Sequence, residues 1–393
     1  MKGTWIMGAA VAGALVAGDR AEAGPIVVPF QLEADHIVIT AAVNGKSGNF
    51  ILDTGSSAAT VTPEFAEGLD LSANQTVQAA GAGAAATQIM FGTAKAVDLG
   101  HSLTLTNMPI GVLPVNPFRT AGRPIAGALG YDVFARWTVQ VDFAASTLRF
   151  IEPADYVVPK DAAVLEADLA LRVPRVAVTV TPRAGAEAVP AKLVLDTGTP
   201  SFAMLLAPGF AAKNGIDKNT PQADLAIGMG TGGLSLGTVT RVAEASFAGV
   251  PLTRPVVGLP HDKNGFFASG LADGTVGQGL FRRGKLTLDY VHNRIVFEPG
   301  PDIAAAWNYP NRCGWYLVSD AAGAKVLHVS GGTPAAEAGV RAGDVITAVD
   351  GKPAQGMDRN TLRAACEASG PLAIAFTREG KPEAATLTRR ALI

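Results

Sequence analysis

Short apolar runs that end at Gly, Asn or Pro recur along most of the chain. Ile37-Val38-Ile39 leads toward a turn signal at Asn44-Gly45, and residues 176–180 alternate apolar and polar side chains before Gly185. Period-two alternation between closely spaced turn residues is typical of β-strands. The pattern therefore predicts a mainly β fold of short strands with a few short helical turns.

Two of these apolar runs end in almost the same residues. Each run leads into an aspartate, a threonine, a glycine and a second hydroxyl residue. The two copies are Phe50-Ile51-Leu52-Asp53-Thr54-Gly55-Ser56 and Leu193-Val194-Leu195-Asp196-Thr197-Gly198-Thr199.

A longer internal repeat surrounds the two copies. Residues 127–134 are similar to residues 274–281, and Gly130 follows Asp53 by 77 positions while Gly277 follows Asp196 by 81. Each half then has two apolar segments that predict a closing hairpin, at 138–143 with 148–150 and at 286–290 with 294–297. We expect two tandem β lobes, residues 24–155 and 156–300, joined near residues 151–161.

Two carboxylates on glycine-containing loops have a specific chemical use. If Asp53 and Asp196 face each other, their like charges retain one shared proton, so that one acts as acid and the other as base toward a trapped water. The flanking residues would permit the tight turn, join the loops and orient the carboxylates. These supporting residues are Thr54, Gly55, Ser56, Thr197, Gly198 and Thr199.

An alternative is a duplicated β domain in which Asp53 and Asp196 only close turns, since Asp and Gly are common turn residues. Two copies inside a matched repeat favour the chemical interpretation. Asp142 and Asp289 are also repeated, but they lie in alternating segments without a glycine turn. We expect these two to be solvated residues on strand faces.

The doubled pattern resembles the retropepsin-type aspartic proteases. Their pattern is an apolar strand leading to D-T-G-S/T, and a later apolar-apolar-Gly segment that packs under the loop. Leu129-Gly130 and Val276-Gly277 match the second part, although Thr275 is polar where an apolar residue is usual. The resemblance covers roughly residues 30 to 300 and implies a bilobal retropepsin-like β-barrel core.

The same resemblance implies an aspartic endopeptidase that needs no metal and no cofactor and forms no covalent intermediate. Both loops stand in one chain, as in pepsin-like enzymes, which implies a monomeric catalytic unit acting on peptide or protein substrates. Two alternatives remain at this point. The fold could bind peptides without cleaving them, or two chains could pair equivalent loops.

Glycine-rich stretches in each half are candidate flaps over such a cleft, because small residues suit a mobile hairpin tip. They contain Gly81 and Gly83 in the first half, and Gly230 and Gly232 in the second. Ordinary surface hairpins are the alternative. Two motif matches near the second stretch, G-x-G-x-x-G and G-x-S-x-G, are rejected because a strand and not a helix is expected to follow.

The last part of the chain reads as a separate module. After a linker at residues 301–310, residues 311–393 resemble a PDZ domain of the bacterial protease-associated kind. The resemblance implies that a loop and strand bind an extended peptide and its exposed C-terminus; a packing or assembly role is the alternative. The residues implied are Gly314, Trp315, Tyr316 and Leu317.

A helix from Asp358 to Ala368 is expected to form one wall of the PDZ groove, with Leu362 and Cys366 on one face. The chain has two cysteines, Cys313 and Cys366. An exported protein could oxidise them, and two free core residues are equally compatible with the sequence.

The first 23 residues have the character of a secretory signal. Lys2 precedes an apolar stretch, and Ala21-Glu22-Ala23 has the small residues that signal peptidase reads. We expect cleavage after Ala23 and export to the periplasm or cell envelope, with no integral membrane segment left. A membrane anchor is the alternative, but the stretch is shorter than the roughly 20 residues that a span needs.

Composition narrows the partners further. The 393 residues have a formal net charge of −2, with 17% charged and 48% hydrophobic residues. The absence of basic clusters argues against nucleic acid as a partner, and the low charge argues against a disordered chain. No Cys/His spacing of a zinc site occurs, so we expect no metal.

Overall fold

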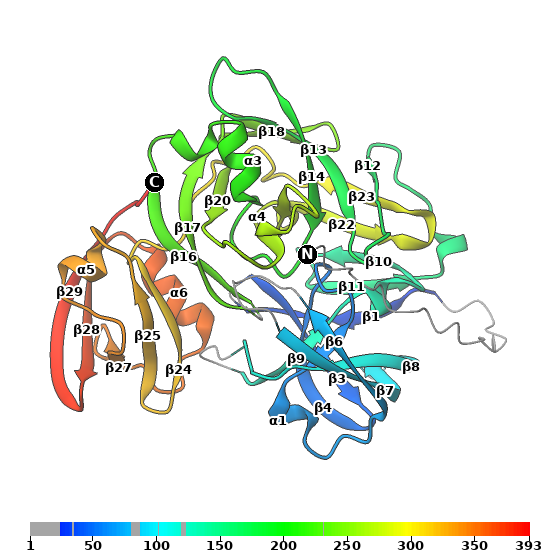
Figure 1. Cartoon of the computed structure of the whole chain (residues 1–393), viewed down its shortest axis with the longest axis horizontal. Helices are drawn as coiled ribbons and strands as arrows, with labels where there is room; N and C mark the ends of the chain where they lie inside the picture. The colour runs from blue at the N-terminus through cyan, green and yellow to red at the C-terminus, as the bar shows by residue number, and fades with distance from the viewer. Residues whose placement is uncertain (1–23, 34, 80–86, 101, 119–122, 231) are drawn as a thin grey trace, which may run out of the picture.

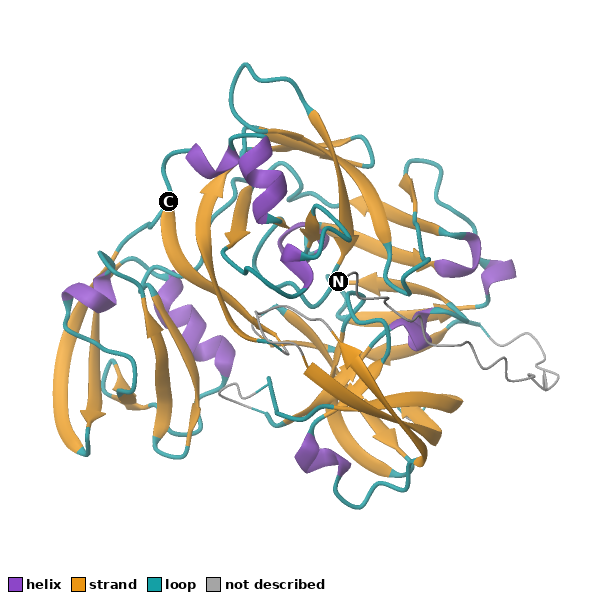
Figure 2. Cartoon of the chain, viewed as in Figure 1, coloured by secondary structure: helices purple, strands orange, loops and turns teal. Residues whose placement is uncertain are grey.

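The computed structural model describes residues 24–33, 35–79, 87–100, 102–118, 123–230 and 232–393. Strands dominate the fold (Figure 2), so the predicted mainly β class is confirmed. In Figure 1 the second lobe occupies the upper part of the view and the first lobe the lower part, and the C-terminal domain lies to the left. The signal-peptide prediction lies outside the described residues.

The first lobe is built on a large, mostly antiparallel sheet. Its strands, in spatial order, are β2 (Gln31–Glu33), β3 (His36–Val43), β4 (Lys46–Leu52), β9 (Ile125–Leu129), β5 (Ala59–Val61), β8 (Leu103–Val112), β7 (Thr87–Leu99) and β6 (Ser72–Ala79). Two short helices, α1 (Pro63–Ala66) and α2 (Tyr131–Phe134), accompany them. Strand β9 is buried at every position and pairs in parallel with β4, which explains its continuous apolar sequence.

The second lobe repeats this plan. Its strands, in spatial order, are β16 (Ala223–Gly230), β17 (Gly233–Arg241), β20 (Val256–Pro260), β15 (Met204–Leu206), β21 (Gly274–Val276), β14 (Val189–Leu195), β13 (Arg175–Thr181), β18 (Glu244–Phe247) and β19 (Val250–Thr253). Its helices are α3 (Pro208–Lys213), α4 (Gln278–Phe281), η2 (Ile216–Lys218) and η3 (Phe266–Ala268). Here β21 pairs in parallel with β14, as β9 does with β4.

A third sheet joins the lobes through the two closing hairpins. It contains β1 (Ile26–Pro29), β11 (Thr147–Ile151), β10 (Thr138–Asp142), β22 (Gly284–Asp289), β23 (Arg294–Pro299) and β12 (Ala163–Glu166), in that order, with η1 (Pro153–Asp155) and η4 (Tyr290–His292) beside them. Strand β10 of the first hairpin pairs antiparallel with β22 of the second. Both predicted hairpins form, and their pairing fixes the lobes side by side.

Asp289 corrects one prediction. It is fully buried in the shared sheet, where its carboxylate accepts hydrogen bonds from Arg294 Nε at 2.6 Å and interacts with His292 Nδ1 at 2.8 Å. The pairing of β10 with β22 removes this side chain from water, and the nearby cation offsets the burial of its charge. Asp142 is half-buried and pairs with Lys285 at 3.1 Å.

The C-terminal residues form a smaller sheet with its own core. Strands β24 (Trp315–Asp320), β25 (Gly323–Val329), β26 (Val345–Val349), β28 (Gly370–Arg378) and β29 (Lys381–Arg389) pair in this order, β27 (Lys352–Pro353) pairs with β26, and the helices are α5 (Pro334–Glu337) and α6 (Arg359–Glu367). The predicted helix is confirmed. The Asp358 carboxylate caps it by accepting from Thr361 N at 2.7 Å, and Leu362 and Cys366 are buried.

Asp35 ties this domain to both lobes. It belongs to the first lobe and is only 5% exposed. Its carboxylate accepts a hydrogen bond from Ser201 Oγ at 3.0 Å and forms ion pairs with Arg282 of the second lobe and Arg363 of α6. A buried carboxylate that loses one of its cations is left with an uncompensated charge, so Asp35 favours the arrangement in which the three parts stay together.

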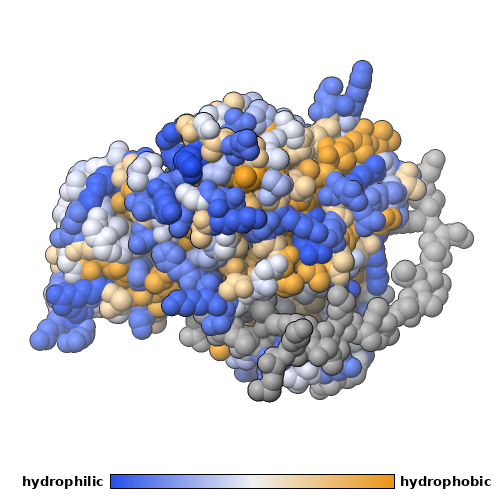
Figure 3. All heavy atoms as spheres, turned by 45° about the horizontal axis from the view of Figure 1, so that its top comes forward, coloured by the Kyte–Doolittle hydropathy of each residue, from blue (hydrophilic) through white to orange (hydrophobic). Residues whose placement is uncertain are grey.

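The main hydrophobic core runs through both lobes and the shared sheet, while the C-terminal domain has a separate core. The face seen in Figure 3 mixes hydrophilic and hydrophobic patches. Large apolar side chains that remain exposed include Val157, Val164 and Val291. In the part of the chain that the structure describes, no helix has the length and apolar character needed to cross a membrane.

Candidate active site

Each aspartate of the repeated pattern follows a strand whose last three residues are buried. Asp53 follows β4 and its N–H donates to Leu129 O at 2.9 Å; Asp196 follows β14 and its N–H donates to Val276 O at 2.9 Å. These bonds extend the parallel pairing of β4 with β9 and of β14 with β21 by one residue. The position of each carboxyl group is therefore set by two strands and not by a free loop.

The two threonines hold the loops to each other. The hydroxyl of Thr54 donates to Leu195 O at 2.7 Å, and that of Thr197 donates to Leu52 O at 2.7 Å. Each hydroxyl also accepts from the opposite backbone N–H, at 2.9 Å and 3.0 Å. Both side chains are buried, so four hydrogen bonds hold the loops together away from competing water.

The two glycines allow the carboxyl groups to meet. A β-carbon at Gly55 would lie 2.6 Å from Asp196 Oδ1, and one at Gly198 would lie 2.8 Å from Asp53 Cγ. Any side chain at either position would therefore collide with the opposite aspartate. Each glycine N–H also donates to the aspartate of its own loop, at 2.9 Å and 2.8 Å.

The segments predicted to pack under the loops do lie there. Tyr131 N, next to Gly130, donates to Ser56 O at 3.0 Å, and Gln278 N, next to Gly277, donates to Thr199 O at 3.0 Å. A β-carbon at Gly130 would lie 2.4 Å from Ser56 O. The close approach explains the glycine at this place.

Ser56 and Thr199 differ, although both were expected to bind their carboxylates. Thr199 Oγ1 donates to Asp196 Oδ2 at 2.6 Å, whereas Ser56 Oγ donates to Ala58 O at 2.7 Å. The prediction is therefore wrong for Ser56. Serine lacks the methyl group that in Thr199 lies against Gly277, so its hydroxyl is free to turn toward the local carbonyl.

The two carboxyl groups have different electrostatic surroundings. Burial and the charge of Asp196 hold the pKa of Asp53 well above its usual range. Burial also raises the pKa of Asp196, but hydrogen bonds from Thr199 and Gly198 favour its ionised form. Both carboxyl groups have backbone donors, and Asp196 has a side-chain hydroxyl donor in addition, so Asp196 is the better placed of the two to bear the negative charge.

Two further polar side chains lie beneath the pair, and motif reading did not identify them. Gln278 is fully buried and its Nε2 donates to Thr197 O at 3.0 Å. Tyr290 is 4% exposed, and burial, Tyr131 and the two aspartates raise its pKa. Its hydroxyl and Gln278 Oε1 have no hydrogen-bond partner among the described residues. Gln278 follows Gly277 as Tyr131 follows Gly130. This shared position after the glycine was the sequence signal that could have identified Gln278 as a site residue.

Of the two candidate flaps, the structure describes only the second. Gly81 and Gly83 lie outside the described residues. Gly230 ends β16 and pairs with Gly233, the first residue of β17, so Gly232 lies in the connection between the two strands of a hairpin. Because these glycines lead into a strand, the rejection of the two helix-requiring motifs is confirmed.

The first part of the predicted PDZ loop is buried and held by a disulfide. A disulfide joins Cys313 to Cys366 of α6, with the Cα atoms 5.5 Å apart. Trp315 is 6% exposed and its Nε1–H donates to Cys366 Sγ at 2.9 Å. Gly314 is buried at φ +80, where a β-carbon would collide with Thr333. Tyr316 and Leu317 are only partly buried, and they lie on β24 at the edge of the sheet.

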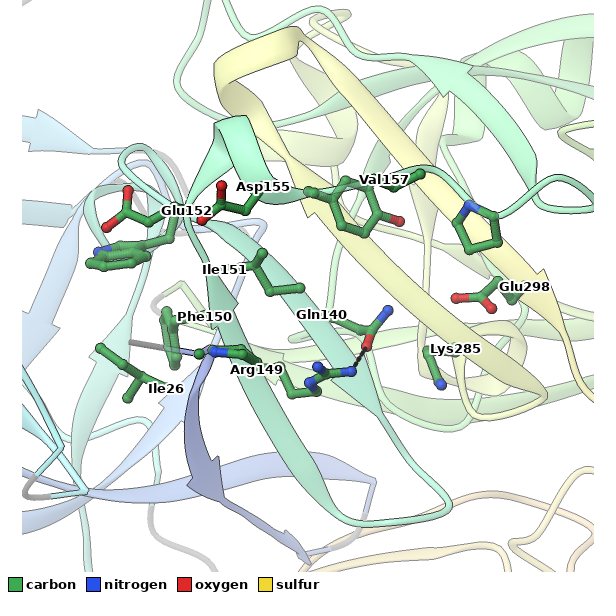
Figure 4. Close-up of a pocket in the computed structure, with 15 residues that line it drawn as sticks. Ile26, Gln140, Arg149, Phe150, Ile151, Glu152, Asp155, Val157, Lys285 and Glu298 are labelled. Carbon is green, nitrogen blue, oxygen red and sulfur yellow. Dashed lines mark hydrogen bonds between the residues drawn. The ribbon is translucent and has the colours of Figure 1, made fainter. Parts of the chain in front are cut away.

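A cavity of about 650 Å³ lies away from the paired loops, against the shared sheet (Figure 4). Its lining includes Gln140, Arg149 and Lys285, and Arg149 donates to Gln140 at 3.3 Å. None of the residues of the two D-T-G loops lines it. Within the described ranges no three His, Cys, Asp or Glu residues gather as metal ligands.

Comparison with known proteins agrees with the class that these loops define. Residues 39–133 match the model of the aspartyl protease family, and residues 325–371 match that of the PDZ domain. The first match contains Asp53 and ends before Asp196. The chain resembles the retropepsin-like aspartic proteases and has a C-terminal PDZ domain, as the sequence predicted.

One solved structure that the chain matches is the crystal structure of a retropepsin-like aspartic protease from Rickettsia conorii. The two are 22% identical; the match covers 32% of this chain and 89% of that chain, with a TM-score of 0.26. No curated protein matches the chain.

Proposed function

We propose that the chain is an aspartic endopeptidase in which Asp53 and Asp196 form the catalytic pair. The observation that supports this most is the reciprocal bonding of Thr54 and Thr197, which holds two half-buried carboxyl groups of one chain in contact. Turn-closing aspartates would have no reason to meet. Because both loops come from one chain, we also propose a monomeric catalytic unit.

The chemistry follows from the unequal pair. Asp196, as the base, takes a proton from a water bound between the carboxyl groups while Asp53, as the acid, polarises the carbonyl of the scissile peptide bond. The water oxygen bonds to the carbonyl carbon and gives a tetrahedral intermediate. Its C–N bond then breaks, the amine nitrogen takes a proton from the pair, and a carboxylic acid and an amine are released.

The remaining parts serve this activity in our proposal. Residues 24–155 and 156–300 are the two lobes, 301–310 the linker and 311–393 the PDZ domain. The hairpin of β16 and β17 closes over substrate. We also infer export to the periplasm or cell envelope after removal of residues 1–23, because the N-terminal pattern is that of a secretory signal.

We further propose that the PDZ domain recruits substrate. Strand β24 lies at the edge of its sheet and α6 stands beside the loop that precedes it, so an extended peptide could add to this edge. Capture of an exposed C-terminus would raise the concentration of a protein substrate near the cleft.

Acid-range hydrolysis of a denatured protein and of a short fluorogenic peptide tests the proposal. Asp53→Asn and Asp196→Asn should each lower kcat/KM by at least ~100-fold, because each removes a proton-transfer group. Asp142→Asn, a repeated aspartate outside the pair, is the matched control and should remain active. A pepstatin-type inhibitor should block the wild-type protein.

Other outcomes of this assay distinguish the alternatives. Wild-type rates in both variants would refute catalysis by this pair and favour a protein that binds peptides without cleaving them. Activity retained by Asp196→Asn alone would indicate that two chains pair equivalent loops. A competitor peptide with a free C-terminal carboxylate should raise KM for the protein substrate only, and its amidated form should not. Equal effects on both substrates would refute recruitment.

A further inference from the structure

Thr275 departs from the apolar residue usual at its place, and the structure shows what it contacts. It lies on β21 beneath the Asp196 loop and is 3% exposed. Its Oγ1 lies 3.0 Å from Thr199 Oγ1, which in turn is 2.6 Å from Asp196 Oδ2. Two buried hydroxyls therefore stand in series behind one carboxylate.

The direction of these hydrogen bonds follows from the number of available protons. A hydroxyl has one hydrogen to donate, and an ionised carboxylate can only accept. If Thr199 gives its hydrogen to Asp196, its oxygen is left as an acceptor for the hydroxyl of Thr275. Bonds arranged in this way polarise one another, which strengthens the bond at the end of the series.

The first lobe provides the comparison. Ala128 occupies the place of Thr275. Ala128 of β9 pairs with Ile51 of β4, as Thr275 of β21 pairs with Val194 of β14, and both residues are 3% exposed. A methyl group cannot donate a hydrogen bond. The hydroxyl of the first loop, on Ser56, donates to a backbone carbonyl and not to Asp53. The series of hydroxyls thus belongs to the second lobe alone.

We propose that Thr275 is a positioning residue that donates to Thr199 and thereby directs the Thr199 hydroxyl at Asp196, so that Asp196 bears the charge of the pair. The role in catalysis rests on the proposed function, whereas the hydrogen-bond series itself does not. Thr275 touches no substrate in this account and acts only through Thr199.

Other groups near Asp196 do not replace this effect. Asp53 faces it from the opposite loop, and Tyr290 of η4 lies within electrostatic reach. The pKa of Tyr290 is raised, so its hydroxyl stays neutral through the acid range. Of the two carboxyl groups, the one that receives the stronger hydrogen bonds bears the negative charge of the pair. Loss of the Thr275 donor should therefore make Asp196 harder to ionise.

The test compares Thr275→Val, which replaces the hydroxyl with a methyl group of similar size, with Thr275→Ser, which restores a hydroxyl. Thr287→Val is the control, because Thr287 is also a fully buried sheet threonine. Thr275→Val weakens the hydrogen bond from Thr199 to the ionised Asp196, which raises the pKa of Asp196, so the acid limb of the kcat/KM profile should move to higher pH in this variant. On that limb kcat/KM should fall about three- to tenfold, with the plateau within about twofold.

Two further results complete the test. Thr275→Ser should return the limb toward the wild-type position, and Thr287→Val should not move it. The carboxyl carbon resonance of Asp196, followed by NMR, should titrate at higher pH in Thr275→Val whether or not the protein cleaves anything. An unmoved limb and an unmoved resonance would overturn the proposal. A moved resonance in a protein without hydrolytic activity would support the hydroxyl series and refute the proposed function instead.

Discussion

The two halves of the site share one backbone plan but differ in the hydroxyls that reach the carboxyl groups. In both lobes the aspartate N–H bonds to the strand beneath, and the threonine of each loop bonds across to the other. Only in the second lobe does a side chain of the same loop, Thr199, donate to the aspartate. A duplicated scaffold thus brings two identical acids together, and a few side chains make them unequal.

The hydrogen bonds of Thr54 and Thr197, which the two lobes share, should be equally sensitive to mutation in either lobe. Their loss should have the largest effect on stability. Thr54→Val and Thr197→Val each leave a buried carbonyl and a buried N–H without their partners. We expect each to lower the free energy of unfolding by about 2 kcal/mol. Urea unfolding of the two variants measures this directly. A difference of more than about 1 kcal/mol between them would break the symmetry of the network.

The unequal part should respond on one side only. Thr199→Ala removes the donor to the ionised carboxylate and should lower kcat/KM about tenfold, since hydrogen bonds to charged groups are the stronger ones. Ser56→Ala removes a bond to a local carbonyl and should change kcat/KM by less than about twofold. Ser56→Ala serves as the control for Thr199→Ala. Equal losses in both would show that Ser56 turns toward Asp53 in solution.

The sequence predicted the meeting of the two loops because the repeat specifies it. Two matched apolar strands, each with a glycine segment at a similar distance downstream, leave few ways to arrange Asp53 and Asp196 other than together. The closing hairpins and the helix capped by Asp358 could likewise be predicted, because each depends on a pattern of neighbouring residues. Thr275 appeared as a departure from the usual pattern, and its neighbour Thr199 supplies the reason.

What the sequence left open depends on contacts between distant residues. The rotation of the Ser56 hydroxyl, the burial of Asp289 in the shared sheet and the disulfide of Cys313 with Cys366 all depend on partners that periodicity does not reveal. Asp35 is the clearest case. Nothing near it in the chain indicates that Arg282 and Arg363 meet it from the second lobe and the PDZ domain.

The central claim is that Asp53 and Asp196 share one proton and that Asp53 holds it. The most direct measurement follows the carboxyl carbon resonances of both residues by NMR over a pH titration of the wild-type protein, with Asp53→Asn and Asp196→Asn for assignment. We predict that Asp196 ionises first and that Asp53 keeps its proton to a distinctly higher pH. Two independent titrations near the ordinary aspartate value of about 4 would contradict the account, as would ionisation in the reverse order.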